Sequence, residues 1–274
     1  MVTDVFAGQY HSVFKGRGME FEEVRQYQPG DEIRSIDWNV TARTGHPYIK
    51  KFVEERQLTV MLLMDASGSS YFGTAGQLKS ELVAELCSVL AFSATKNNDR
   101  IGLIIFSDRI EKFIPPRKGL RHVLRVIREV LYHTPQGKGT DIELALEYLN
   151  GVIRKKAVCF LISDFYGCDF KQRLKIANKR HDMVAMTVTD PHEIELPNAG
   201  ILKLHDAETR EEFYVDTTNS DIRKIFNANS KKLRQERSYL LRQAGVDTID
   251  IRTDEPYTKA LFRFFKKRER RARI

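Results

Sequence analysis

From Leu58 onward, apolar runs of strand length alternate with segments of helical periodicity, and no other feature of the chain constrains its fold as strongly. The first run, Leu58–Met64, reads LTVMLLM and is followed at once by Asp65. The segment Gln77–Asn97 then has helical spacing, with apolar side chains on one face at Leu78, Leu82, Leu86, Leu90 and Ala94. Apolar strands separated by helices indicate a parallel sheet that is covered on both faces.

The same alternation continues toward the end of the chain. We predict further strands at Ile101–Phe106, Ile110–Ile114, Ala157–Ile162, Met183–Val188 and Val246–Ile251. We predict further helices at Leu120–Tyr132, Ile142–Val152, Phe170–Arg180 and Ser220–Ala244, the last of which is long and basic. In the helix 120–132, the face expected to be buried consists of Leu120, Val123, Leu124, Ile127 and Leu131.

The lengths of the connections decide the topology. Only three residues separate the strand 101–106 from the strand 110–114. This pair must form an antiparallel hairpin, because a parallel crossover needs about a dozen residues or more. A second hairpin, with strands at Ile201–His205 and Glu212–Val215, is predicted as an insertion near residues 200–216. The predicted fold is therefore α/β, a doubly wound, Rossmann-like, mostly parallel sheet with one antiparallel edge strand.

Both ends of the chain differ from this central part. Residues 1–57 show no helical period, and we expect a segment rich in strands and loops that packs on the main domain, 58–255, with Trp38 at least half buried. Pro256 is expected to begin a final basic helix or tail over residues 256–274. The stretch Lys259–Arg273 carries a net charge of +7 out of +8 for the whole chain, and we interpret it as solvated.

Several classes of protein are excluded by what the sequence lacks. No apolar stretch approaches the roughly 20 residues of a membrane helix, and the first residues lack the apolar core of a signal peptide. Cys87, Cys159 and Cys168 fit neither a disulfide scaffold nor a zinc knuckle, so a reducing, cytoplasmic location is expected. The glycines of Gly137–Thr140 do not have the order of a phosphate-binding loop, and no HExxH or GxSxG motif occurs at a suitable place.

Polar side chains follow three of the predicted elements where each meets the same edge of the sheet. Asp65, Ser67 and Ser69 alternate directly after the first strand, Thr140 precedes the helix 142–152, and Asp164 follows the strand 157–162. Their five oxygen donors can converge on one point, and such a set suits Mg²⁺, with Mn²⁺ or Ca²⁺ as alternatives. Because three of the donors are neutral hydroxyls, the ion would accept a further carboxylate from a partner protein.

These residues resemble a known site. Asp65-x-Ser67-x-Ser69, Thr140 and Asp164 match the metal-ion-dependent adhesion site of von Willebrand factor A domains. Upstream, the string EFEEVRQYQPGDEIRSIDWNVTAR at residues 20–43 is similar to the signature of a bacterial family, domain of unknown function 58. The resemblance implies a non-enzymatic, metal-ion-dependent protein-protein interaction module. It also implies a partner class, the MoxR-type AAA+ ATPases, with which such proteins act as adaptors or co-chaperones.

Other interpretations of the same residues stay open. Ser and Asp after a strand are ordinary helix caps, and Thr140 could be an N-cap. The signature residues Arg25, Asp31, Arg34, Asp37 and Arg43 could pair among themselves or form a partner-binding surface. A metal-dependent hydrolase is an alternative function, although the sequence places no histidine or lysine nearby as a general base. A nucleic-acid binder is another, acting through Lys259–Arg273 and the basic residues Lys231, Lys232, Arg234 and Arg237.

Overall fold

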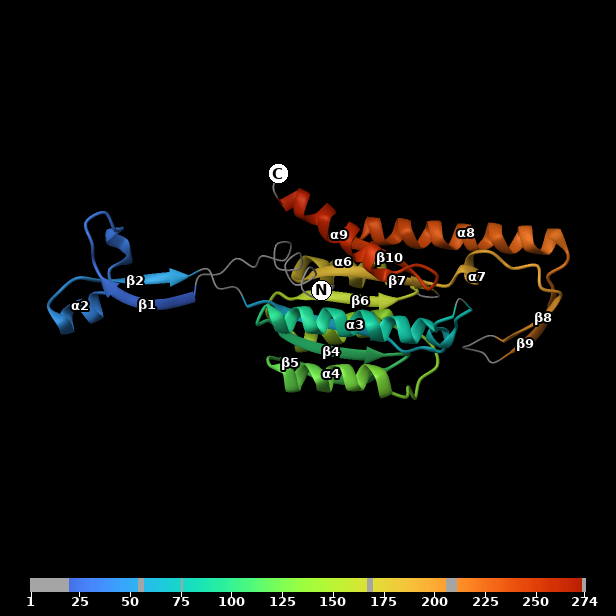
Figure 1. Cartoon of the computed structure of the whole chain (residues 1–274), viewed down its shortest axis with the longest axis horizontal. Helices are drawn as coiled ribbons and strands as arrows, with labels where there is room; N and C mark the ends of the chain where they lie inside the picture. The colour runs from blue at the N-terminus through green and yellow to red at the C-terminus, as the bar shows by residue number, and fades with distance from the viewer. Residues whose placement is uncertain (1–19, 54–56, 75, 167–169, 206–210, 273–274) are drawn as a thin grey trace. The chain divides into compact units, whose positions relative to one another are not determined.

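The structure is a computed structural model that describes residues 20–53, 57–74, 76–166, 170–205 and 211–272 (Figure 1). The chain divides into two compact units, of which the smaller is Phe14–Leu58 and the larger contains the residues from Thr59 to the end. Cys87 and Cys159 are buried, as expected of core thiols, whereas Cys168 lies outside the described residues. No helix in the described part of the chain combines the length and the apolar character needed to cross a membrane.

A six-stranded sheet forms the centre of the larger unit, in the order β10-β7-β6-β3-β4-β5. Its strands are β3 (Thr59–Asp65), β4 (Arg100–Phe106), β5 (Ile110–Arg117), β6 (Val158–Ser163), β7 (Asp182–Thr189) and β10 (Asp247–Arg252). Every pair is parallel except β4 with β5, which is antiparallel and lies at the edge. The predicted doubly wound sheet, with one antiparallel edge strand, is confirmed.

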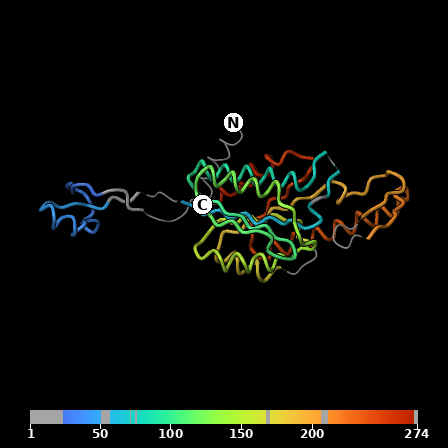
Figure 2. The backbone as a smooth tube through the Cα atoms, turned by 90° about the horizontal axis from the view of Figure 1, so that it is seen from below, coloured from blue at the N-terminus to red at the C-terminus, as the bar shows by residue number. Residues whose placement is uncertain are grey.

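Helices cover both faces of this sheet (Figure 2). They are α3 (Lys79–Lys96), α4 (Leu120–Tyr132), α5 (Ile142–Val152), α6 (Lys171–Arg180), the short α7 (Pro191–Ile194), α8 (Ser220–Gln243) and α9 (Tyr257–Ala272). Side chains of α5, α6 and the end of α8 share one apolar cluster with the strands. The helices α3 and α4 pack against each other. The predicted insertion is also present, as the hairpin of β8 (Ile201–His205) and β9 (Glu212–Asp216).

The predicted buried face of α4 is wrong. The structure buries Val123, Val126 and Val130, and it leaves Leu120, Leu124 and Leu131 half exposed. The apolar residues of this helix occupy two adjacent arcs, and the valine arc is the one that packs inward. In α3, by contrast, the predicted residues Leu82, Leu86, Leu90 and Ala94 are all buried.

The basic C-terminal segment is a packed helix over its described residues, which corrects the interpretation of a solvated tail. Leu261 and Phe265 of α9 are almost fully buried, and the helix contacts β10. Two of its arginines make ion pairs with the sheet: Arg268 with Asp182 and Asp247, and Arg271 with Asp247. Part of the positive charge is therefore neutralised within the fold.

The smaller unit contains an antiparallel pair, β1 (Glu20–Gln26) and β2 (Tyr48–Val53), and two short helices, η1 (Ile33–Ser35) and α2 (Trp38–Thr44). The helix α2 was not expected. Asp37 begins it by accepting hydrogen bonds from two backbone N–H groups, and Gly45, with φ of 76°, ends it. The strands and loops that were predicted are otherwise present.

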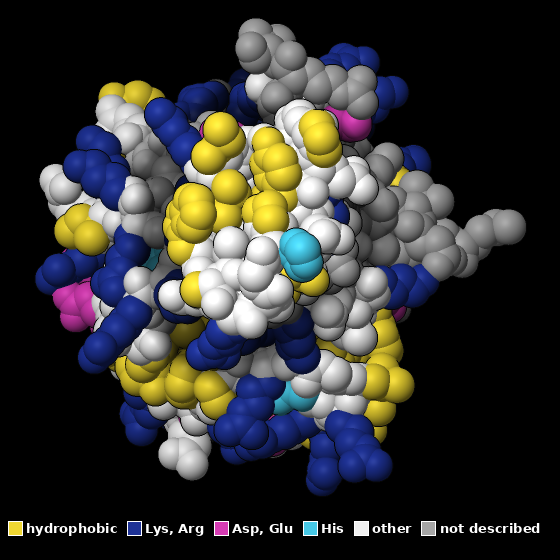
Figure 3. Space-filling view, turned by 90° about the vertical axis from the view of Figure 1, so that its left-hand side faces the viewer, with side chains coloured by type: hydrophobic (Ala, Val, Ile, Leu, Met, Phe, Trp, Pro, Cys, Tyr) yellow, Lys and Arg dark blue, Asp and Glu magenta, His cyan; other side chains and the backbone are white. Residues whose placement is uncertain are grey.

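Pairing among the signature residues is found in part. Arg25 donates two hydrogen bonds to the carboxylate of Asp31, at 2.9 and 2.7 Å, whereas Asp37 pairs with Lys50. Trp38, expected to be at least half buried, is 67% exposed in this structure, because a unit of this size has little core of its own to receive an indole ring. Hydrophobic side chains are visible at the surface in Figure 3.

Candidate metal centre

The predicted site residues lie at the carboxyl ends of β3 and β6, two neighbouring strands in the middle of the sheet. The order of connection reverses between these strands, since the chain moves from β3 toward β4 and β5 and then returns to β6. In doubly wound sheets, ligands bind in the crevice at such a switch point. Asp65 is the last residue of β3, and Asp164 directly follows the last residue of β6.

Hydrogen bonds connect four of the five predicted residues. One carboxylate oxygen of Asp65, Oδ1, accepts from the backbone N–H of Ser67 at 2.9 Å. The other, Oδ2, lies 3.5 Å from the hydroxyl of Thr140. The hydroxyl oxygens of Ser67 and Ser69 are 3.1 Å apart. The oxygens of two separate loops therefore meet around the carboxylate of Asp65, as the sequence predicted.

Ser163 is a contact of this carboxylate that the sequence analysis did not single out. Its hydroxyl donates to Asp65 Oδ2 at 2.6 Å. Burial raises the pKa of Asp65 to about 6, the hydrogen bond from Ser163 opposes this rise, and the negative charge of Asp164 adds to it. A buried carboxylate close to a second one is electrostatically costly without a positive charge nearby.

The fifth residue, Asp164, is held by groups that the sequence did not reveal. Its carboxylate lies 3.4 Å from the ammonium of Lys79, which is 3% exposed. The same ammonium lies 2.8 Å from Glu193 of α7. Burial alone would lower the pKa of Lys79, but the two carboxylates outweigh it and raise this pKa. A lysine is therefore close to the site after all, although it is held in the protonated form and cannot serve as a general base.

The backbone turns sharply just after Asp164. Phe165 adopts a left-handed conformation, with φ of 58°, which is uncommon for a bulky residue. Its N–H donates to the hydroxyl of Ser163 at 3.0 Å, and its ring packs edge-on against Phe170. From α8, Arg237 donates to the carbonyl oxygen of Asp164 at 2.8 Å. The conformation of this turn is thus fixed from three sides.

A third set of contacts fixes the loop that carries Thr140. The carboxylate of Glu111 accepts from the hydroxyl of Ser107 at 2.7 Å and from the N–H of Gly137 at 2.7 Å. A Cβ atom on Gly137 would lie 2.1 Å from the hydroxyl oxygen of Ser107, so only glycine fits there. The N-cap of α5 is Asp141, which accepts from a backbone N–H in the first turn. Thr140 is therefore not the N-cap, and its hydroxyl is available to the site.

The donor set fits a hard divalent cation. The donors are carboxylate and hydroxyl oxygens, which Mg²⁺, Mn²⁺ and Ca²⁺ accept. Within the described residues, no group of three or more His, Cys, Asp and Glu side chains could hold an ion. Any ion here would thus depend on Asp65 and Asp164 together with the hydroxyls.

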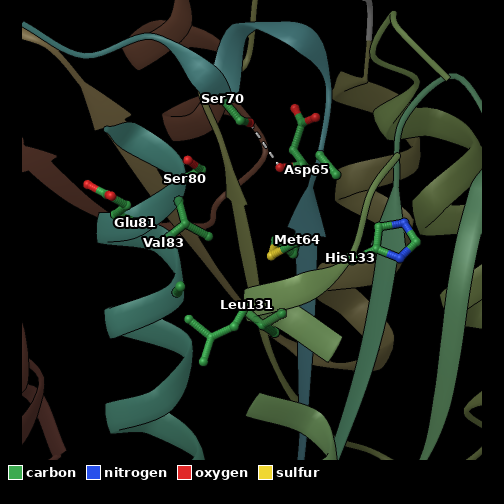
Figure 4. Close-up of a pocket in the computed structure, with 11 residues that line it drawn as sticks. Met64, Asp65, Ser70, Ser80, Glu81, Val83, Leu131 and His133 are labelled. Atoms are coloured by element: carbon green, nitrogen blue, oxygen red, sulfur yellow. Dashed lines mark hydrogen bonds between the residues drawn. The ribbon is translucent and has the colours of Figure 1, made fainter. Parts of the chain in front are cut away.

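A small cavity of about 140 Å³ lies beside the site, between β3, α3 and the end of α4. In Figure 4 the carboxylate of Asp65 points away from Met64 and Leu131, which line the cavity. Ser70 joins the two regions, because its hydroxyl donates to the carbonyl oxygen of Asp65 at 3.1 Å. The cavity is mostly apolar and is separate from the cluster of oxygen donors.

Comparison with known proteins places this arrangement among relatives. A family profile described as "Protein of unknown function DUF58" matches residues 23–236. An uncharacterized protein of Mycobacterium tuberculosis is 31% identical over 273 residues, which are 98% of this chain and 85% of the relative.

Two solved structures are similar in fold. An aerotolerance-related membrane protein of Bacteroides fragilis is 14% identical, with a TM-score of 0.52 over 77% of this chain and 99% of that one. The von Willebrand factor A domain of SpRpn10 is 9% identical, with a TM-score of 0.41 over 76% of this chain and 94% of that domain.

Proposed function

This chain belongs to the family of proteins of unknown function DUF58, with a von Willebrand factor A-like fold, and on that premise we propose that it is a metal-ion-dependent protein-interaction module. The observation that supports this most is the hydrogen-bonded cluster of Asp65, Ser67, Ser69 and Thr140 at the switch point of the sheet. Asp65, Ser67, Ser69, Thr140 and Asp164 would hold Mg²⁺, or Mn²⁺ or Ca²⁺ in its place.

The chemistry of the donors indicates what such a site can do. A bound divalent ion would supply a positive charge and a ligand position that a carboxylate of the partner can fill. Asp164 shares its charge with Lys79, and the three hydroxyls carry none, so the chain neutralises the ion only in part. A partner carboxylate at this partly dehydrated edge would be bound more strongly than in an exposed ion pair.

The partner that the family resemblance implies is a MoxR-type AAA+ ATPase, with this chain as its adaptor or co-chaperone. The proposal places the module in the cytoplasm, where its buried free thiols, Cys87 and Cys159, would stay reduced. It assigns no catalytic residue, since Lys79 is held protonated. Nucleic-acid binding is not proposed, because Arg237 is buried and Arg268 and Arg271 pair with aspartates.

The first test measures the metal. Titration calorimetry with Mg²⁺ is expected to show binding to the wild type and none to Asp65→Ala, while the Asp254→Ala control binds as the wild type does. Asp254 is a suitable control because it lies beyond β10 and pairs with Arg252, outside the donor set. Equal binding by the wild type and Asp65→Ala would remove Asp65 from the site.

The second test concerns the partner. An affinity capture from the native cell, run in Mg²⁺ and again in EDTA, is expected to retain a partner only with the metal. The same partner should be lost with Asp65→Ala and kept with Asp254→Ala. A partner that is retained equally in EDTA and by Asp65→Ala would show that the interface lies elsewhere on the chain.

A further inference from the structure

A groove runs along β10, the last strand of the six-stranded sheet on one side. Its volume is about 430 Å³, and five consecutive residues, Val246–Asp250, line it. Successive side chains of a strand point to opposite faces of the sheet. A groove that is lined by five residues in a row therefore follows the edge of the strand and not one of its faces.

The open edge of β10 offers backbone groups to a partner. On one side, β10 pairs in parallel with β7 over its whole length. On the other side, no strand of the described chain lies next to it. An unpaired strand edge presents N–H and C=O groups on which an extended peptide can add as a further strand.

The walls of the groove are basic. One face of α9 lines it, with Arg263, Lys267 and Arg271 spaced at intervals of four residues, and Arg242 at the end of α8 lines it as well. Arg242, Arg263 and Lys267 are exposed and make no ion pair with another described residue. The acidic residues of the groove are Asp247 and Asp250, and Asp247 is already paired with Arg268 and Arg271. The surplus charge is therefore positive.

We propose that this groove binds an extended acidic segment of a partner protein, which adds to the edge of β10 as a strand and directs acidic side chains toward Arg263 and Lys267. The site is independent of the candidate metal centre, because β7 separates β10 from β6. Backbone pairing with β10 supplies affinity, and the basic wall of α9 selects acidic sequences.

Two other occupants fit the groove less well. A nucleic acid has no backbone amide to pair with a strand edge, and Asp250 on the strand would repel its phosphates. A second copy of this chain, paired edge to edge, would bring two basic α9 walls together, and like charges at an interface are unfavourable. An acidic peptide satisfies both the backbone groups and the charges.

The test measures the binding of synthetic peptides to the full chain by fluorescence anisotropy. The probe is a labelled peptide of alternating Glu and Val residues, which is acidic and extended. A second probe has proline in place of each valine, so that it keeps the charge but lacks half of its N–H groups. The third probe is single-stranded oligothymidylate.

The protein variants separate the groove from general charge attraction. Arg263→Glu with Lys267→Glu reverses two charges in the groove, and Lys231→Glu with Lys232→Glu makes the same change on exposed residues of α8. Thermal melting should be alike for both double variants, because all four residues are exposed. We expect the groove variant to bind the Glu/Val peptide roughly tenfold more weakly than the wild type, and the α8 variant to bind it nearly as well.

The proline probe should also bind roughly tenfold more weakly than the Glu/Val peptide. The proposal is overturned if the wild type does not bind the Glu/Val peptide, or if the two double variants lose affinity equally. It is also overturned if the proline probe binds as well as the Glu/Val peptide, because strand addition then plays no part. Tight binding of oligothymidylate that only the groove variant loses would make this a nucleic-acid groove instead.

Discussion

Replacing Lys79 by methionine removes an ammonium group that lies between two carboxylates, 3.4 Å from Asp164 and 2.8 Å from Glu193. Methionine keeps much of the length of the side chain but none of its charge. Removing one partner of a buried ion pair typically costs about 3–5 kcal/mol, because the other charge is left uncompensated. Glu193 is partly solvated, with 22% of its side chain exposed, so we expect a loss of about 3 kcal/mol in the free energy of unfolding in EDTA.

Mg²⁺ should restore part of this loss. If Asp164 is a ligand of the ion, then the ion supplies the positive charge that Lys79 no longer provides. A ligand at one hundred times its Kd stabilises the folded state by about 2.7 kcal/mol, and tighter binding at the same concentration stabilises it more. The gain in stability on adding Mg²⁺ should therefore be larger for Lys79→Met than for the wild type.

Urea denaturation of both proteins, in EDTA and in Mg²⁺, measures these quantities, with Lys232→Met on the exposed surface of α8 as the control. The control should change stability by less than about 0.5 kcal/mol under both conditions. A loss below about 1 kcal/mol for Lys79→Met in EDTA would refute the argument that the ion pair is buried and uncompensated without its lysine. Equal gains from Mg²⁺ in the wild type and in Lys79→Met would remove Asp164 from the ligands.

Two further changes test the support of the site and of the core. Gly137→Ala should cost about 1–3 kcal/mol in urea unfolding and weaken Mg²⁺ binding in calorimetry, because its Cβ would overlap Ser107 and displace the loop of Thr140. Gly139→Ala, whose Cβ would meet nothing closer than 3.8 Å, should change neither measurement, and equal effects would disprove the overlap. His181 is buried, and this burial, with the charge of Arg180, lowers its pKa to about 4. The unfolded state binds a proton near pH 6.5 and the folded state does not, so the wild type should lose up to about 3 kcal/mol as the pH falls from 6.5 to 4. His181→Leu should lose less over that range in urea titrations, and parallel curves would contradict this.

Local signals in the sequence were sufficient for the sheet and for most of the oxygen donors. The apolar runs define the strands, and Asp65 and Ser163 stand where two of those runs end. Lys79 and Arg237 could not be predicted in the same way, because each reaches Asp164 from more than 70 residues away in the sequence. A lysine in the first turn of a helix is ordinarily exposed, and only the packed structure shows that this one is buried.

Where the prediction was wrong, the pattern was ambiguous or was not used. The helix α4 has two apolar arcs, and the sequence does not say that Val126 faces inward and Leu124 outward. The helix α2 had readable signals, an aspartate at its beginning and Gly45 at its end. Its short length hid the period by which longer helices are found.

The hydrogen bond from Arg237 separates the position of the turn after β6 from the chemistry of the residue at that turn. Arg237 binds the carbonyl oxygen of Asp164, an atom that every amino acid carries. The carboxylate of the same residue is held from the other side, by Lys79. A change of side chain at position 164 would therefore leave the main chain anchored to α8. Relatives of this protein could exchange the ligand chemistry of the turn without having to rebuild the scaffold that supports it.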